Sequence, residues 1–213
     1  LFLFQNLLKK KANVITDIDI PQYQTIKKIV KKRNQKIFTI GSKKSYLELI
    51  KSDYKNDKQY FQIKHKNKVY DLVVNLIGKI QIKNVLMAMI AAEKSNIKFE
   101  KIANSINKIK PVNGRFEKIG HLNNNSKVIL DYAHTPDALT NCLESLKQQF
   151  KNQKIIIVFG CGGDRDKSKR SQMGKIVNKL CDKIYLTDDN PRFENEKKIR
   201  LEIKKSINKT KLY

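Results

Sequence analysis

The chain has 213 residues, of which 40% are hydrophobic and 31% are charged, and its formal net charge is +25. This length allows one large domain or two small ones, each with a real core. No apolar run approaches the ~20 residues of a membrane span, and the opening residues 1–4 are too short for a signal peptide. The chain starts without Met and ends in a helical pattern without a stop signal, so we expect a piece of a longer protein.

The large excess of basic residues suggests nucleic-acid binding. The lysines, however, are spread along the whole chain and interleaved with Asn and Ile, and they do not form one stripe. This pattern is typical of a biased coding sequence that places lysines on solvated faces, and we favour it over a dedicated nucleic-acid surface. Weak binding to polyanions is still expected from the charge.

The three cysteines are Cys142, Cys161 and Cys181, with no CxxC pair and no histidine at metal-ligand spacing. Cys142 and Cys181 lie on apolar faces of predicted helices and are expected in the core. Nothing indicates a disulfide framework, so a reducing cytosol is the expected compartment.

Residues 1–110 alternate between helical and strand patterns. The spacing of apolar residues predicts helices at 2–10, 22–33, 82–94 and 99–109. Short apolar or alternating runs predict strands at 13–16, 37–40, 60–65 and 68–76. The last two strands flank Asn67 and are predicted to form a hairpin.

The turn-rich stretch 111–114 is the predicted domain boundary. Beyond it, strands are predicted at 115–119 and 128–131, with a turn at 123–125. Thr135 and Pro136 are predicted to start a helix that runs to about residue 150, as N-cap and first helical residue. Strands alternate with helices throughout, which indicates an α/β fold with a parallel sheet covered on both faces.

The stretch 154–192 reads as a β-α-β unit. Its predicted elements, and the helix that follows, are a strand at 155–159, a helix at 168–181, a strand at 184–186 and a last helix from about Glu194. A glycine turn follows the first strand and a polar turn follows the second. Ligands bind at the carboxyl ends of strands in open α/β sheets, so both turns are candidate binding loops.

Three places carry candidate chemistry. Asp131 and His134 lie between a strand and a helix start that offers free N–H groups to a phosphate or carboxylate, although both could merely cap the turn. Arg165, in a glycine loop that lacks GxxxxGK[ST] and GxGxxG, could bind a carboxylate with two hydrogen bonds. The second polar turn has side chains that could bind both charges of a zwitterion: Asp188, Asp189, Asn190 and Arg192. It could equally be a solvated loop without a ligand.

Four motifs in order resemble the Mur ligase family: Gly114 with Arg115, then residues 131–137, 160–165 and 189–192. The resemblance covers essentially the whole chain. It implies that residues 1–110 are the end of a parallel-sheet, P-loop-type central ATP-binding domain. Residues 111–213 would be most of a Rossmann-like C-terminal domain that binds an amino acid.

The resemblance implies an enzyme of peptidoglycan precursor synthesis that uses ATP and Mg²⁺. ATP would phosphorylate the γ-carboxylate of D-glutamate in UDP-MurNAc-L-Ala-D-Glu, and the amine of meso-diaminopimelate would attack the acyl phosphate. Phosphorylation supplies a leaving group, and magnesium offsets the phosphate charge. The resemblance also implies a cytoplasmic monomer with no specific nucleic-acid partner and no membrane span.

The resemblance assigns residues to ATP and to catalysis. Asn84 would contact the nucleotide base, Arg115 would reach ATP, and Asp131 would lie near the ribose and phosphates. His134 would lie close by, so Arg115, Asp131 and His134 are the expected catalytic residues. No metal ligand is expected within this stretch.

The motif at 189–192 would select meso-diaminopimelate over L-lysine. Asp189 belongs to it, and the distal amino-acid end of the substrate would be held by Arg165, Asn190 and Arg192. L-lysine has no second carboxylate, so a charge-assisted contact of roughly 1.5–3 kcal/mol would be lost, about 10- to 100-fold in affinity.

The chain departs from the family pattern in several places. Gln81 stands where Asn is common, with the same donors and acceptors, and Asn113 stands where Pro is frequent. The P-loop and the carbamylated lysine that helps to hold magnesium would precede Leu1. The Gly-Lys-Gly-His-Glu segment of the amino-acid pocket would follow Tyr213. We therefore expect this stretch alone to be inactive.

Four other interpretations stay open. An L-lysine-adding ligase is disfavoured by Arg192. A folylpolyglutamate synthase-like ligase shares the architecture, but the motifs at 160–163 and 189–192 argue against it. A basic nucleic-acid-binding module is a distant alternative. A degenerate pseudoenzyme is disfavoured by the intact Arg115, Asp131 and Arg192.

Overall fold

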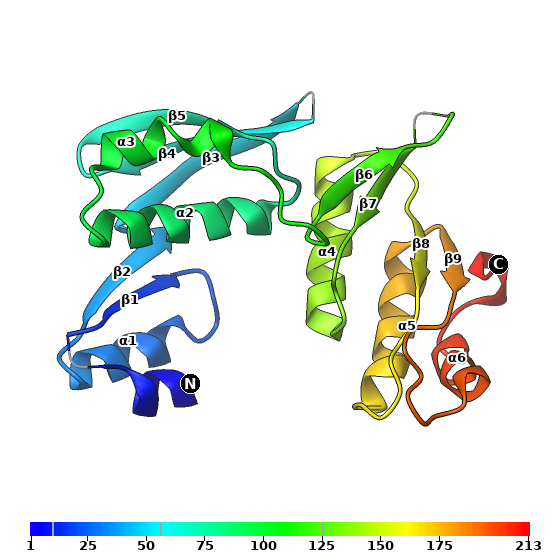
Figure 1. Ribbon diagram of the computed structural model, residues 1–213. Coiled ribbons are helices and arrows are strands. Elements are labelled where there is room, and N and C mark those ends of the chain that lie inside the picture. Colours follow the sequence, from blue (N-terminus) through cyan, green and yellow to red (C-terminus); the bar gives the residue numbers. More distant parts are fainter. Residues whose placement is uncertain (10, 56, 125) are drawn as a thin grey trace. The chain divides into compact units, whose positions relative to one another are not determined.

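The computed structural model describes residues 1–9, 11–55, 57–124 and 126–213. The chain divides into two compact units, Leu1–Val112 and Asn113–Tyr213 (Figure 1). The division falls inside the turn-rich stretch 111–114. We call these unit 1 and unit 2.

Unit 1 contains a five-stranded sheet of order β1-β2-β3-β4-β5. The strands are β1 (Asn13–Asp17), β2 (Lys36–Gly41), β3 (Leu47–Lys55), β4 (Lys58–His65) and β5 (Lys68–Val74). The first three run parallel, while β3, β4 and β5 pair antiparallel. The helical segments are η1 (Leu3–Leu7), α1 (Tyr23–Lys32), α2 (Lys79–Lys94), α3 (Phe99–Ala103) and η2 (Ile106–Lys108).

The predicted hairpin around Asn67 is confirmed, and the predicted parallel sheet is present as β1, β2 and β3, to which β4 and β5 add antiparallel strands. The short turns before and after β4 permit only antiparallel pairing, because a parallel partner needs a long crossover. Strand β3 was not predicted because much of it is exposed and polar. The expected N-terminal helix is a π-helical turn, and Lys10 lies outside the described residues.

The helix predicted at 99–109 is wrong, since α3 ends at Ala103 and η2 begins at Ile106. Between them, the Ser105 hydroxyl donates to the Lys101 carbonyl at 2.8 Å. Ser and Asn side chains compete with the backbone for hydrogen bonds, which favours a break here.

The core of unit 1 lies between the sheet and α2. The predicted inward face of α2 is confirmed, because Val85, Leu86, Met89 and Ile90 are all buried. Figure 1 shows α2 running beside the sheet, and it contacts β1 and β2. A smaller apolar cluster of Val14, Ile26 and Val30 joins β1 to α1.

Unit 2 contains two two-stranded sheets. Strands β6 (Glu117–His121) and β7 (Lys127–Leu130) are antiparallel, and β8 (Ile156–Phe159) and β9 (Lys183–Leu186) are parallel. The helices are α4 (Pro136–Gln149), α5 (Ser168–Leu180), α6 (Glu196–Lys204) and η3 (Lys209–Lys211). The predicted β-α-β unit is therefore confirmed as β8-α5-β9. The turn predicted at 123–125 ends on Asn125, which lies outside the described residues.

The core of unit 2 is built around α5, which packs against both α4 and α6. Cys142, Cys161 and Cys181 are buried and unpaired by disulfides, so the predicted core positions of Cys142 and Cys181 are confirmed. Burial raises the pKa of the Cys142 and Cys181 thiols to about 12. Both thiols therefore stay protonated at neutral pH.

Helix α4 begins as predicted, with Thr135 at the N-cap and Pro136 at the first helical position. The Thr135 hydroxyl oxygen accepts a hydrogen bond from the Ala138 N–H at 3.2 Å. We expect Thr135→Ala to lower the free energy of unfolding by about 1 kcal/mol, measured by urea denaturation. Thr135→Ser keeps the acceptor and serves as the control. Equal losses in the two variants would contradict this account of the cap.

None of the helices in the described part of the chain combines the length and the apolar character that crossing a bilayer requires.

Candidate functional site

The loops that follow β8 and β9 lie against each other. The Gly163 N–H donates to the Asn190 carbonyl at 2.9 Å. A Cβ on Gly163 would lie 1.8 Å from the Pro191 carbonyl oxygen, and one on Gly160 would lie 2.4 Å from the Thr187 carbonyl oxygen. Because a side chain has no room at either position, glycine is what lets the two loops close on each other.

Arg192 ties the two loops together. Its Nη1 donates to the Gly163 carbonyl at 2.6 Å, and its backbone N–H donates to Asn190 Oδ1 at 3.1 Å. A Cβ on Gly162 would lie 2.9 Å from Arg192 Nη1 and 3.6 Å from Asp189 Oδ2. The structure thus brings Asp189, Asn190 and Arg192 together around the glycine loop.

Two other predicted residues of these loops lie apart from that group. Arg165 is exposed, and within the described part of the chain no hydrogen bond or ion pair joins it to Asn190 or Arg192. The carboxylate of Asp188 is paired with Arg200 of α6. That Arg165 and Arg192 bind the same carboxylate of a ligand stays a prediction.

Arg170 lies on the first turn of α5, and the sequence patterns did not indicate a role for it. Its side chain is fully buried, and it bonds to Glu194 through both terminal nitrogens, at 2.9 and 3.1 Å. This pairing, with a hydrogen bond from the Asp164 N–H, lowers the pKa of Glu194 to about 2. A helical face shared with the apolar Met173 and Val177 is the signal that could have revealed the buried position.

Asp131 and Arg115 are adjacent at the start of unit 2. Asp131 Oδ2 accepts a hydrogen bond from the Phe116 N–H at 2.9 Å, so it holds the backbone beside Arg115. The Arg115 guanidinium carbon lies 4.6 Å from the centroid of the Tyr132 ring, an arrangement suited to a cation–π contact. His134 is exposed, and its Nδ1 lies 3.1 Å from the Tyr132 carbonyl oxygen.

Asn84 lies on the exposed face of α2 in unit 1. Its Nδ2 donates to Gln81 Oε1 at 3.4 Å, so two amide side chains sit one helical turn apart. The amide of Gln81 therefore occupies the same face as Asn84, as expected for a replacement of Asn. The neighbouring Lys83 is bound to the buried carboxylate of Asp17 at 2.5 Å.

Within the described residues, no group of three or more His, Cys, Asp or Glu side chains has the arrangement of a metal site. The lysine that the family resemblance assigns to magnesium would precede Leu1, so no magnesium ligand is assigned to the described residues.

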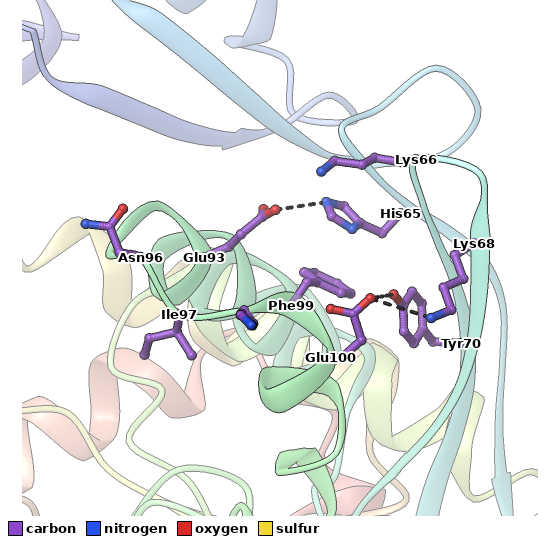
Figure 2. Close-up of a pocket in the computed structure, with 10 residues that line it drawn as sticks. His65, Lys66, Lys68, Tyr70, Glu93, Asn96, Ile97, Phe99 and Glu100 are labelled. Carbon is purple, nitrogen blue, oxygen red and sulfur yellow. Dashed lines mark hydrogen bonds and ion pairs between the residues drawn. The ribbon is translucent and has the colours of Figure 1, made fainter.

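A cavity of about 480 Å³ lies elsewhere in unit 1, between the β4–β5 turn, the end of α2 and the start of α3 (Figure 2). None of the predicted site residues lines it. His65 is 4% exposed, stacks on Phe99 with ring centroids 3.9 Å apart, and has Nε2 at 3.3 Å from Glu93 Oε1. The Tyr46 hydroxyl donates to the other oxygen of Glu93 at 2.7 Å.

Burial lowers the pKa of His65 below its ordinary value of 6.5. The unfolded chain therefore binds the proton more tightly, so the stability contributed by neutral His65 is complete above pH 6.5 and is lost as the pH falls below it. We expect His65→Phe, which keeps the stacked ring, to flatten the decline in unfolding free energy between about pH 7 and about pH 5. The exposed His121, changed to Phe, is the control. A slope in His65→Phe equal to that of the wild type would refute this assignment.

Comparison with known proteins accounts for both units. The family model described as "Mur ligase middle domain" matches residues 1–92, and "Mur ligase, glutamate ligase domain" matches residues 114–212. The chain belongs to the Mur ligase family. The predicted membership and α/β fold class are thus confirmed.

Mur ligases named as diaminopimelate-adding enzymes are among the relatives. The Rickettsia prowazekii (strain Madrid E) protein named "UDP-N-acetylmuramoyl-L-alanyl-D-glutamate--2,6-diaminopimelate ligase" is 38% identical over 206 residues, which are 96% of this chain and 42% of that protein. The Rickettsia typhi protein of the same name is 39% identical over 96% of this chain and 41% of its own length. The chain thus spans about two fifths of these relatives.

Solved structures agree with this assignment. A structure titled as the same kind of ligase has a TM-score of 0.59 at 28% identity and covers 99% of this chain and 43% of its own. A Mycobacterium tuberculosis folylpolyglutamate synthase, complexed with ADP and AMPPCP, has a TM-score of 0.76 at 16% identity, over 94% of this chain and 44% of its own. The second likeness concerns the fold alone.

Proposed function

We propose that the full-length protein is an ATP-dependent ligase that adds meso-diaminopimelate to UDP-MurNAc-L-Ala-D-Glu in peptidoglycan precursor synthesis. The observation that carries this proposal is the docking of the glycine loop 160–163 onto the motif 189–192, with Arg192 between them. The names of the relatives support the same substrates. We further propose that the enzyme is a cytoplasmic monomer.

The docked loops have the polar groups that a zwitterion needs. One nitrogen of the Arg192 guanidinium is engaged by Gly163, which leaves other N–H donors for a carboxylate. The Asn190 side-chain NH₂ is a second donor, since its Oδ1 is the atom that accepts the Arg192 N–H. Asp189 uses Oδ1 locally, so Oδ2 can accept from an ammonium group. We propose that Arg165 adds a second cation for the same distal end.

We propose that Asn84 contacts the base of ATP, and that Arg115 contacts its phosphates. Asp131 would act partly through the backbone, because its bond to the Phe116 N–H fixes the residue next to Arg115. His134 would lie close to the nucleotide at the start of α4. Preorganised cationic donors stabilise the charge that develops during phosphoryl transfer.

The proposed chemistry joins a carboxylate to an amine. The γ-phosphoryl group of ATP passes to a carboxylate oxygen of D-glutamate and releases ADP. The amine nitrogen then attacks the carbonyl carbon, the C–O bond to phosphate breaks, and the nitrogen loses a proton as the amide forms. We propose that the full-length enzyme uses magnesium, which offsets the phosphate charge and would be held by residues outside this stretch.

The test is ADP release by the full-length protein, supplied with ATP, magnesium and UDP-MurNAc-L-Ala-D-Glu. We expect release to depend on added meso-diaminopimelate, and Arg115→Ala to lower kcat by about 100-fold through the loss of a charge-stabilising donor. Lys175→Ala, which removes an exposed cation from α5, is the control. The proposal would be contradicted if the folded protein released no ADP. It would also be contradicted if ADP release were the same without UDP-MurNAc-L-Ala-D-Glu and meso-diaminopimelate.

A further inference from the structure

We infer that Arg170 positions the loop 187–194 for binding of the incoming amino acid. Arg170 would not touch the substrate itself; it would act through Glu194 on Arg192. The substrate in this inference rests on the proposed function, while the positioning of the loop rests on the geometry alone.

The Arg170 guanidinium joins three separate segments of unit 2. Its two bonds to Glu194 reach the end of the loop 187–194, and a bond of 2.7 Å from Nη1 reaches Glu202 on α6. Its Nη2 lies 3.4 Å from the Gly162 carbonyl oxygen. One side chain on α5 thus links the glycine loop, the loop 187–194 and α6.

Arg170 and Glu194 form an ion pair that is largely shielded from solvent, and we call this pair the clamp. Glu194 is 12% exposed and Arg170 1% exposed at their side chains. Lys167 Nζ also lies 3.4 Å from Glu194 Oε2, but the Lys167 side chain is exposed. Removing Arg170 therefore leaves Glu194 with a single cationic partner at the surface, and such surface pairs contribute little. The two-bond geometry also fixes the direction of Glu194, not only its distance.

The clamp lies two residues from Arg192, at a point where the backbone needs support. Arg192 has a φ of 51° and Asp164 has a φ of 49°, the left-handed region that is unfavourable for residues other than glycine. Glu194 Oε1 accepts the Asp164 N–H at 2.6 Å, and Asp164 Oδ2 accepts the Phe193 N–H at 3.0 Å. Such conformations persist where surrounding contacts hold them, and here Arg170 anchors those contacts.

The test uses Arg170→Lys and Arg170→Met in the full-length protein. We expect the KM for meso-diaminopimelate to rise about 10-fold or more in Arg170→Met, and less in Arg170→Lys, with the KM for ATP within about twofold of wild type. Ser171→Ala is the matched control, because Ser171 bonds to Ser206 at 2.9 Å and so joins α5 to the turn that follows α6, with no bond to the loop 187–194.

A second readout does not depend on catalysis. Hydrogen exchange of the amides in 187–194 is expected to be at least about 10-fold faster in Arg170→Lys than in wild type or Ser171→Ala, while exchange in α4 is unchanged. Unchanged exchange in the loop would overturn the inference. Faster exchange with an unchanged KM for meso-diaminopimelate would overturn the link to the substrate. Absence of amino-acid-dependent turnover in the wild type would sink the proposed function, and the exchange result would still decide the role of Arg170.

Discussion

Gly163→Ala is expected to lower kcat/KM for meso-diaminopimelate by about 100-fold, which corresponds to about 3 kcal/mol. The new Cβ would lie 1.8 Å from the Pro191 carbonyl oxygen, a backbone atom that cannot rotate out of the way. The loops must therefore separate, which weakens the bond from Gly163 to Asn190 and the bond from Arg192 to Gly163. Overpacking costs about 1–3 kcal/mol, and each lost hydrogen bond adds about 1 kcal/mol.

Gly120→Ala is the control for this experiment, because no described atom lies within 4 Å of a Cβ at that position of β6. It is expected to change the unfolding free energy by less than about 0.5 kcal/mol. Steady-state kinetics and urea unfolding of both variants give the comparison. If Gly163→Ala is as active as Gly120→Ala, the two loops do not form the amino-acid site.

Arg192→Ala is expected to reduce the preference for meso-diaminopimelate over L-lysine by about 10- to 100-fold, since one charge-assisted contact to a carboxylate is worth roughly 1.5–3 kcal/mol. Arg192→Lys keeps the charge but loses the planar fork that binds Gly163 and a carboxylate together, so we expect an intermediate loss. The measurement is kcat/KM for both amino acids, with the KM for ATP unchanged.

The matched control for Arg192 is Arg200→Ala. Arg200 also bonds to the loop 187–194, through Asp188. This ion pair is partly exposed, so it is expected to contribute little to the stability of the loop. A wild-type preference retained by Arg192→Ala would show that another residue reads the distal carboxylate.

Local patterns were sufficient to predict the β8-α5-β9 unit and the start of α4. Apolar runs, helical spacing and the Thr135–Pro136 pair act over a few residues, so a single sequence reveals them. Strand β3 was not predictable in this way, because its exposed polar face carries no alternation and its place comes from pairing with β4. Tertiary pairing overrode the local signal.

The candidate site also contains residues that local motifs predict and residues whose role depends on tertiary contacts. The motifs identified Asp189, Asn190 and Arg192, and the structure gathers them, but the reason for the glycines is tertiary. The sequence indicated only a glycine turn after a strand, whereas the structure shows that Gly160 and Gly163 permit the close approach of the loop after β9. The buried position of Arg170 was not predictable from the sequence, because a charged residue is normally expected at the surface. Its carboxylate partners lie 24 and 32 residues away in the chain.

The most direct test of the amino-acid site is a competition experiment with the full-length protein. ATP, magnesium and UDP-MurNAc-L-Ala-D-Glu are supplied with meso-diaminopimelate and L-lysine at equal concentrations, and the products are identified by mass. We predict that the meso-diaminopimelate product exceeds the L-lysine product by at least about 10-fold, as one extra charge-assisted contact requires. A predominant L-lysine product would contradict the role assigned to Arg192 and its loop.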